Sequence, residues 1–324
     1  MHLIVRAVLA AVLAGGLVSS AGAQTKWDMP TPYPDGNFHT KNIARFAEDV
    51  DKATGGSLKI AIHPAGSLIK HPDIKRAIRQ GTAPIGEILI SLAANEAPVY
   101  GLDSVPFLAA GYDAAKKLYA AQKPYLEKRL AEEGLVLLYS VPWPPQGIYA
   151  KREIKSTDDL KGLKFRTYNT MTGRIAALAG AIPTQIEVPD LPTAFATGRV
   201  DVMITSASTG VDTKAEDYLT HYHDTQAWLP RNMVFVNKAA FDRLSATEKK
   251  AVTDAATAAE ERGWKASVDE MTIKTKALRA AKIIVLPPSD ALKAGLTKIG
   301  ETIAAEWSAS AGPDGKAMLD AYRK

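Results

Sequence analysis

The chain has 324 residues, contains no cysteine and carries a formal net charge of +5 at neutral pH. The lack of cysteine excludes disulfide bonds and thiolate metal sites. Lysine and arginine are scattered among acidic residues without a run of five like charges, which argues against a nucleic-acid partner.

Residues 1–23 have the composition of a secretory signal peptide. They contain the basic residue Arg6, an apolar run over 7–18 and the triplet Ala21-Gly22-Ala23, which is typical of a cleavage site. The apolar run is shorter than the roughly 20 residues that a membrane-spanning helix needs. We therefore expect a periplasmic protein cut after Ala23, with an uncleaved N-terminal anchor as the alternative. The 301 residues that would remain, 324 less 23, suggest two domains.

The first half of the mature chain alternates between helix-like and strand-like segments. In the first helix Ile43, Phe46 and Val50 recur at helical spacing, and Gly55-Gly56 ends it. This alternation predicts an α/β fold with a largely parallel sheet. Helices are expected over 37–53, 71–80 and 114–133, and strands over 57–63, 85–90 and 135–141.

A proline-rich stretch over 142–147, Pro-Trp-Pro-Pro-Gln-Gly, interrupts this series. It cannot lie inside a helix or a central strand, so we interpret it as a crossover to a second lobe. Residues 229–232 are interpreted as a second crossover. The elements expected around it are strands over 163–167, 200–205, 218–228 and 233–237, and helices over 171–179 and 191–197, the latter with Asp190 as N-cap.

A long helix is predicted to follow the second crossover. Ser245 and Glu248 form the S-x-x-E pattern of a capping box, and helix-favouring residues continue to about Lys282. Such a helix would be about 48 Å long, more than one small domain, so we expect it to run across both lobes. The alternative is two helices broken at Gly263.

Catalytic and metal-binding motifs are largely missing from the sequence. The pair His221 and His223 shares one face of a predicted strand, but no third ligand is apparent, so a polar strand face is favoured over a metal site. A secreted enzyme would have to bring His39, Glu87 and Asp201 into one site. We expect no catalytic residues, no metal and no cofactor.

One segment carries a specific resemblance. Residues 158–166, DDLKGLKFR, resemble a signature of the extracytoplasmic solute-binding subunits of tripartite ATP-independent periplasmic (TRAP) transporters, the DctP-like family. The resemblance extends in order over nearly the whole mature chain. The other matching segments are 53–60 (ATGGSLKI), 64–68 (PAGSL), 106–108 (PFL), 194–201 (AFATGRVD) and 236–244 (VNKAAFDRL).

The resemblance implies an α/β, two-lobed periplasmic-binding-protein fold with two crossover segments and a long helix spanning both lobes. Lobe 1 would comprise 24–142 plus 231–270, and lobe 2 would comprise 143–230 plus 271–324. The implied function is capture of a small organic carboxylate by closure of the lobes and its delivery to TRAP membrane permease subunits. A periplasmic sensor subunit with the same ligand is the alternative.

The resemblance also implies that Arg166 pairs with the carboxylate of the ligand. A guanidinium suits this role because its planar fork stays charged and binds a carboxylate through two hydrogen bonds. Taken by itself, Arg166 would be interpreted as one half of an ion pair between strands.

Two departures from the family pattern bear on the ligand. Gln146 falls near where some members have an arginine, and the missing charge argues against a dianionic ligand. Thr205 stands where many members have an asparagine, which makes this part of the pocket less polar. Trp143 and Trp228 flank the crossovers and, if they line the cleft, favour an apolar body. We therefore expect an aromatic or hydrophobic monocarboxylate, with a sugar acid, a hydroxy acid or a dicarboxylate as alternatives.

Further ligand contacts are predicted at positions where a structural role is equally expected. These are Tyr33, Asn37 and His39 in the first strand–helix loop, which the resemblance places at the cleft, Glu87 toward the end of the strand expected over 85–90, Asn169 just after Arg166, and Asn232 at the second crossover.

Overall fold

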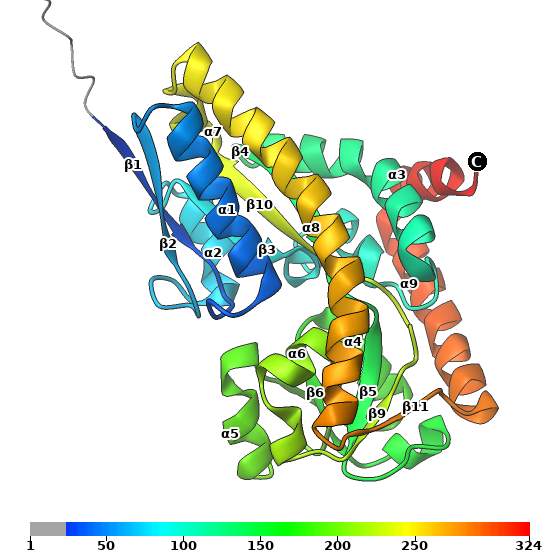
Figure 1. The fold of residues 1–324 in the computed structure, drawn as a ribbon. Coiled ribbons are helices and arrows are strands. Elements are labelled where there is room, and N and C mark those ends of the chain that lie inside the picture. Colours follow the sequence, from blue (N-terminus) through cyan, green and yellow to red (C-terminus); the bar gives the residue numbers. More distant parts are fainter. Residues whose placement is uncertain (1–23) are drawn as a thin grey trace, which may run out of the picture.

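The computed structural model describes residues 24–324, so the predicted signal peptide and its cleavage site lie outside the described residues. Figure 1 shows two lobes, with the N-terminal elements in the upper lobe and the green segments between about 146 and 223 in the lower lobe. This is the mixed α/β, two-lobed fold that the sequence predicts.

Lobe 1 is built on two small sheets. Strands β1 (Thr25–Pro30) and β2 (Leu58–His63) pair in parallel. In the second sheet β10 (Arg231–Asn237) lies between β3 (Ile85–Leu89) and β4 (Leu135–Pro142) and is antiparallel to both. The helical elements of this lobe are α1 (Phe38–Ala53), α2 (His71–Arg79), η1 (Ile90–Ala93), η2 (Pro98–Ser104), α3 (Gly111–Glu132) and α7 (Lys238–Asp242).

Lobe 2 is built on one six-stranded sheet. Its strand order is β11 (Ile284–Leu286), β9 (His221–His223), β5 (Gln146–Ala150), β8 (Val202–Ser206), β6 (Lys164–Thr167) and β7 (Ile182–Gln185). The helical elements are α4 (Thr170–Leu178), α5 (Leu191–Ala196) and α6 (Ala207–Asp212), with short 3₁₀ turns η3 (Thr157–Leu160), η4 (Val188–Asp190) and η5 (Ala215–Asp217).

Several expected elements of lobe 2 differ from the structure. Only His221–His223 of the strand expected over 218–228 pairs in the sheet. Asp190 occupies the N-cap position of α5, but its side chain makes no capping hydrogen bond. Strands β5, β7 and β11 are not among the predicted elements, because β5 begins inside the proline-rich stretch, β7 contains a proline and β11 has only three residues.

The expectation of a largely parallel sheet is wrong. Strand β5 runs antiparallel to β8 and β9, and β10 runs antiparallel to β3 and β4, while the pairs β6–β7, β6–β8 and β9–β11 are parallel. The physical reason is the connectivity, since β5 and β10 are the strands that follow the two crossovers. Each therefore enters its sheet from the other lobe, in the direction opposite to its neighbours.

The two crossover segments lie side by side and pair with each other. Trp143 N donates to Pro230 O at 2.8 Å, Gln146 N donates to Trp228 O at 3.0 Å, and Ala227 N donates to Gln146 O at 3.1 Å. Both crossovers are shorter than predicted, because Gln146 already belongs to β5 and Asn232 to β10.

A continuous helix, α8 (Ala246–Ala280), connects the two lobes (Figure 1). It begins with the predicted capping box of Ser245 and Glu248 and is not broken at Gly263. In lobe 1, Asn42 Nδ2 on α1 donates to the carbonyl of Ala259 at 2.9 Å. In lobe 2, Lys274 of the same helix lies 2.9 Å from Asp212.

Gly263 allows α8 to lie close to lobe 1. A Cβ at this position would lie 2.3 Å from Val141 Cγ2 and 2.8 Å from Asn42 Nδ2. We expect Gly263→Ala to destabilise the protein by about 1–3 kcal/mol through overpacking, even though alanine is the better helix former. Chemical unfolding measures this, with the exposed Thr257→Ala on the same helix as control. An unchanged midpoint in Gly263→Ala would show that helix and sheet can move apart freely.

The C-terminal helix α9 (Asp290–Arg323) returns to lobe 1 (Figure 1). It kinks at Gly312, which has φ 57° and ψ −146°. Trp307 Nε1 donates to Pro98 O at 2.8 Å and Tyr322 Oη donates to Leu108 O at 3.0 Å. The predicted boundary, which assigned 271–324 to lobe 2, therefore does not hold for the second half of α9; the other boundaries stay predictions.

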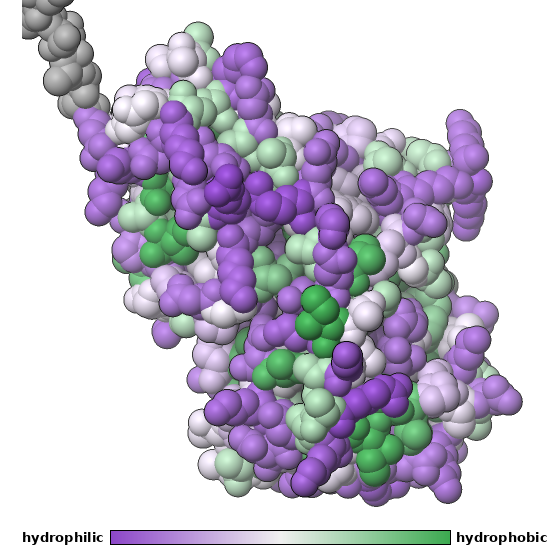
Figure 2. Space-filling view, in the orientation of Figure 1, coloured by the Kyte–Doolittle hydropathy of each residue, from purple (hydrophilic) through white to green (hydrophobic). Residues whose placement is uncertain are grey.

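The surface is predominantly polar on the face drawn in Figure 2, where separate hydrophobic areas are surrounded by hydrophilic ones. Within 24–324, no helix combines the length and the apolar character needed to cross a bilayer. The exposed large hydrophobic residues are spread over several elements: Leu68, Ile182, Val268, Ile273 and Ile284.

Candidate ligand-binding pocket between the lobes

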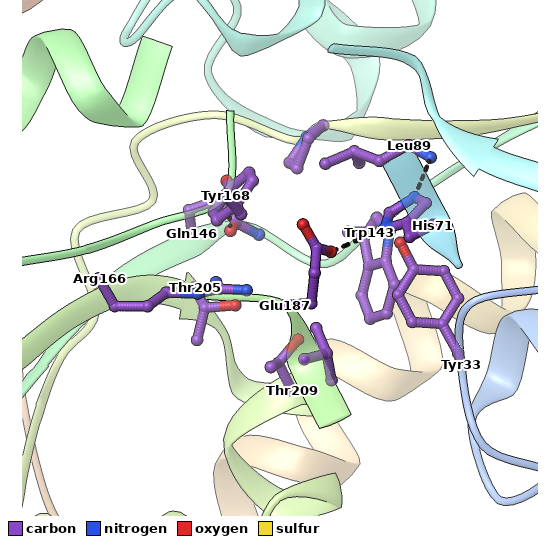
Figure 3. A pocket seen from close by; sticks show the side chains of 12 residues that line it. Tyr33, His71, Leu89, Trp143, Gln146, Arg166, Tyr168, Glu187, Thr205 and Thr209 are labelled. Atoms are coloured by element: carbon purple, nitrogen blue, oxygen red, sulfur yellow. Dashed lines mark hydrogen bonds and ion pairs between the residues drawn. The ribbon is translucent and has the colours of Figure 1, made fainter. Parts of the chain in front are cut away.

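A pocket lies between the two lobes beside the crossovers (Figure 3). It contains about 390 Å³ of empty space, part of which is open to solvent. Because this figure includes space that is open to solvent, the enclosed room for a ligand is smaller than 390 Å³, which suits a compact ligand. The lining residues are Tyr33, His71, Leu89, Trp143, Gln146, Arg166, Tyr168, Glu187, Val188, Thr205, Thr209 and Pro230.

Three neighbouring strands of lobe 2 deliver polar side chains to this pocket. Strand β6 runs parallel to both β7 and β8. Arg166 lies near the carboxyl end of β6, Thr205 lies near that of β8, and Glu187 follows β7. The carboxyl ends of parallel strands meet at one edge of a sheet, which is where α/β proteins usually bind ligands.

Arg166 is buried and carries a charge that no protein carboxylate neutralises directly. Its side chain is 1% exposed, Nε donates to Ile186 O at 2.9 Å, and Cζ lies 4.8 Å from the centre of the Tyr168 ring. Burial lowers the pKa of Arg166, and the nearby Glu187 carboxylate opposes this effect. Among residues 24–324, the guanidinium forms no ion pair with a carboxylate within 4.0 Å, so its terminal nitrogens are available for a ligand.

Aromatic rings form part of the pocket wall. Tyr168 Oη donates to Gln146 Oε1 at 3.0 Å, and Gln146 Nε2 donates to Pro144 O at 3.0 Å. Gln146 thus fixes the ring beneath Arg166. Tyr33 and Trp143, which also line the pocket, meet edge to face with their ring centres 4.9 Å apart.

Three polar contacts connect the lobes around the pocket. His71 Nδ1 lies 3.0 Å from Glu187 Oε2. Asn37 Nδ2 donates to Asp212 Oδ2 at 2.8 Å, and Asn169 Nδ2 donates to Ser91 Oγ at 2.8 Å. In each pair one partner belongs to the N-terminal elements of lobe 1 and the other to lobe 2. The two lobes are therefore in direct contact around the pocket, as in a closed binding protein.

A buried polar network lies behind Trp143. Glu87 accepts hydrogen bonds from Thr31 Oγ1 at 2.5 Å and from Asn232 Nδ2 at 2.8 Å. Asn232 Oδ1 in turn accepts from Trp143 Nε1 at 2.8 Å. Burial raises the pKa of Glu87 to about 7. The network therefore fixes the orientation of the pocket tryptophan through a carboxyl group that titrates near neutrality.

His39 completes this network from α1. Its Nδ1 lies 3.6 Å from Glu87 Oε1, and its ring lies 4.4 Å from that of Trp143. Burial lowers the pKa of His39 well below its usual value, so the imidazole is neutral at neutral pH. The contact between His39 and Glu87 is therefore not an ion pair of two charged groups.

The structure brings together half of the predicted ligand-binding residues. Asn37 and Asn169 line adjoining cavities of the cleft, and Trp228 is buried outside the pocket lining. His39, Glu87 and Asn232 lie behind the wall, where they use their polar groups on one another and on Thr31 and Trp143. Contact with a ligand stays a prediction for those that line the pocket, namely Tyr33, Trp143, Gln146, Arg166 and Thr205.

Two other sites are conceivable from the sequence: an enzyme site of His39, Glu87 and Asp201, and a metal site at His221 and His223. The structure gives these residues other roles. Asp201 accepts a hydrogen bond from Lys164 N at the start of β6, whereas His39 and Glu87 are buried in lobe 1. His223 Nε2 accepts a hydrogen bond from Ile154 N at 2.9 Å, which gives it a structural role. The part of the chain that the structure describes holds no cluster of three or more potential metal ligands.

Sequence reasoning missed important lining residues, above all Glu187 and His71. Glu187 follows β7. The sequence of this strand, Ile-Pro-Thr-Gln, does not indicate a strand, because proline is rare in central strands. His71 comes from the N-terminus of α2, 116 residues away in sequence. The signal that could have found Glu187 is its place next to the Arg166 strand, at the edge where parallel strands end.

Comparisons with known proteins agree with this architecture. The family described as bacterial extracellular solute-binding protein, family 7 (DctP) matches residues 31–309. The extracytoplasmic solute receptor DctP6 of Bordetella pertussis, which binds pyroglutamic acid, is 50% identical, with a TM-score of 0.91 over 92% of this chain and 99% of that one. A TRAP solute-binding protein from an unidentified marine microbe, solved with co-purified pyroglutamate, is 42% identical, with a TM-score of 0.91 over 93% of this chain and 99% of that one.

A curated relative is more distant. A solute-binding protein of Albidiferax ferrireducens is 27% identical over 217 residues, which cover 65% of this chain and 63% of the relative.

Proposed function

Because the chain belongs to family 7 of the bacterial extracellular solute-binding proteins and is a TRAP solute receptor, we propose that it captures a compact organic monocarboxylate between its lobes. We propose further that it acts outside the cytoplasm and delivers this ligand to TRAP permease subunits in the membrane.

The observation that carries the proposal is the buried, unpaired guanidinium of Arg166 in the interlobe pocket. A buried charge is costly unless a partner neutralises it. A ligand carboxylate is the natural partner, because it matches the planar fork with two charge-assisted hydrogen bonds. Ligand contacts with both lobes would then add to the stability of the closed arrangement.

The ligand is proposed to be a small cyclic acid such as pyroglutamate, rather than the aromatic or hydrophobic acid expected from the sequence. The aromatic preference has no support, since two relatives at 42–50% identity bind pyroglutamate. It also rested on two tryptophans, of which only Trp143 lines the pocket. The small volume of the pocket favours a compact ring over a large one.

A second carboxylate on the ligand would be unfavourable here. The Glu187 carboxylate lines the same pocket as Arg166, and the lining residues include no lysine and no second arginine. A dicarboxylate would therefore place one of its charges near Glu187 or leave it buried without a partner.

Thermal unfolding with a panel of acids tests the proposed function. Because a relative was solved with co-purified ligand, the protein is first unfolded, dialysed and refolded. At 100 times its Kd, the ligand should stabilise the protein by about 2.7 kcal/mol. We expect pyroglutamate to raise the unfolding temperature more than phenylacetate, succinate or glucuronate does. Stabilisation by succinate or glucuronate alone would overturn the proposed ligand class, and no response to any carboxylate would overturn the function.

A further inference from the structure

The two oxygens of the Glu187 carboxylate are used unequally. Oε2 lies 3.0 Å from Nδ1 of His71. Oε1 is buried and has no hydrogen-bond partner in the part of the chain that the structure describes. A buried carboxylate oxygen without a donor is rare in proteins, because its desolvation is not compensated. In a ligand pocket, such an atom marks a position where a donor is missing.

The hydrogen bonds around His71 define which atoms carry protons. Leu89 N donates to Nε2 of His71 at 3.2 Å, so Nε2 acts as the acceptor. The proton of a neutral imidazole then lies on Nδ1 and points to Glu187 Oε2. Burial tends to raise the pKa of Glu187, but His71, Arg166 and the side chain of Gln185 outweigh it, and the pKa is lowered overall. Glu187 is therefore an ionised acceptor whose second oxygen needs an N–H or O–H group.

One short segment of backbone positions both charges of the pocket. Ile186 O accepts the hydrogen bond from Arg166 Nε, and Glu187 is the next residue. Figure 3 shows the Glu187 carboxylate between Arg166 and His71. The pocket thus presents a fixed cation and a hydrogen-bond acceptor that are positioned by adjacent residues of one backbone segment.

Resting on the proposed function, we infer that Glu187 determines specificity by accepting a hydrogen bond from an N–H group of the ligand while Arg166 holds the carboxylate. The ligand class is then cyclic amides that carry one carboxylate, in which the N–H and the carboxylate sit on neighbouring atoms of a small ring. His71 is a positioning residue, which orients Glu187 from the other lobe. Recognition of the N–H would therefore favour the closed state.

A pair of ligands with the same shape tests this inference. Pyroglutamate carries the ring N–H, whereas 5-oxotetrahydrofuran-2-carboxylate has a ring oxygen in its place. Hydrogen bonds to charged groups are strong, and the ring oxygen would in addition face the Glu187 oxygen. We expect calorimetry to show that the wild type binds the lactone about 10- to 100-fold more weakly than the lactam.

The variant Glu187→Gln probes the residue itself. Its amide can turn its NH2 group toward the ring oxygen, so the preference for the lactam should fall to within a few-fold. His71→Asn should reduce the same preference by loosening Glu187. The exposed Glu153→Gln serves as the matched control and should keep the wild-type ratio. Unfolding without ligand establishes that each variant folds.

The outcomes separate this inference from the proposed function. Equal affinity of the wild type for lactam and lactone would overturn the role of Glu187 while leaving carboxylate capture by Arg166 intact. A full lactam preference in a folded Glu187→Gln would do the same. Failure of both compounds to bind the wild type would instead count against the proposed function. The comparison of the two ligands uses only the wild-type protein, so its outcome does not depend on whether a variant folds.

Discussion

Replacing Arg166 with alanine is expected to remove most carboxylate binding and to leave the fold intact. The guanidinium is buried in the pocket, and a ligand carboxylate would lose its charge-assisted partner. Truncating one partner of a buried charge pair costs about 2–5 kcal/mol, a factor of roughly 30 to several thousand in affinity. The loss of affinity should lie toward the upper end of this range, because the Glu187 carboxylate in the same pocket would then repel the carboxylate of the ligand.

Titration calorimetry with pyroglutamate measures this loss. Arg166→Lys should also bind poorly, since an ammonium group cannot form the two parallel hydrogen bonds of the guanidinium. The exposed Arg45→Ala on α1 is the control and should bind like the wild type. Near-normal affinity in Arg166→Ala would place the anchor of the carboxylate elsewhere in the cleft.

The stability of the protein is expected to fall as the pH rises from about 4.5 to about 7 through the single carboxyl group of Glu87. Burial raises its pKa from 4.5 to about 7, so in this window the folded state holds a proton that the unfolded state has released. Folding is therefore favoured most below pH 4.5, and the contribution is lost as the pH passes through 7. The difference of pKa corresponds to about 3 kcal/mol.

The variant Glu87→Gln isolates this contribution from that of all other groups. A glutamine can keep both hydrogen bonds, because its oxygen accepts from Asn232 and its NH2 group donates to the Thr31 hydroxyl. We expect the variant and the wild type to be similarly stable at pH 4.5 and the variant to be more stable by about 2–3 kcal/mol at pH 8. Denaturant unfolding at several pH values measures the difference, with the exposed Glu48→Gln as control. Parallel pH curves for Glu87→Gln and the wild type would contradict the raised pKa.

The parts of the fold that local sequence patterns encode could be predicted from the sequence. The capping box of Ser245 and Glu248 correctly predicts where α8 begins, and the length of the helical pattern predicts that the helix reaches both lobes. The DDLKGLKFR segment leads to Arg166, which lines the pocket, and its contact with a ligand stays a prediction. In both cases a few adjacent residues contain the information.

The rest depends on pairing between distant segments. Strand β5 begins at Gln146, inside the stretch that its prolines mark as a crossover, and its hydrogen-bond partners lie in β8 and β9. The role of Glu187 depends on His71 and on the neighbouring strand β6, neither of which is adjacent in sequence. Asn232 resembled a ligand contact because it is polar and near a crossover, but its place in β10 directs it to Glu87.

The short connection between β4 and β5 has a consequence for the conformational entropy of binding. Only residues 143–145 separate the two strands, and Pro144 and Pro145 have their φ angles fixed by their rings at about −65°. The second crossover is hydrogen-bonded to the first, which restricts its backbone as well. Such a connection has few torsions left to lose when the lobes come together, so closing orders little of the chain. More of the free energy of the ligand contacts then appears as affinity, as in any preorganised receptor.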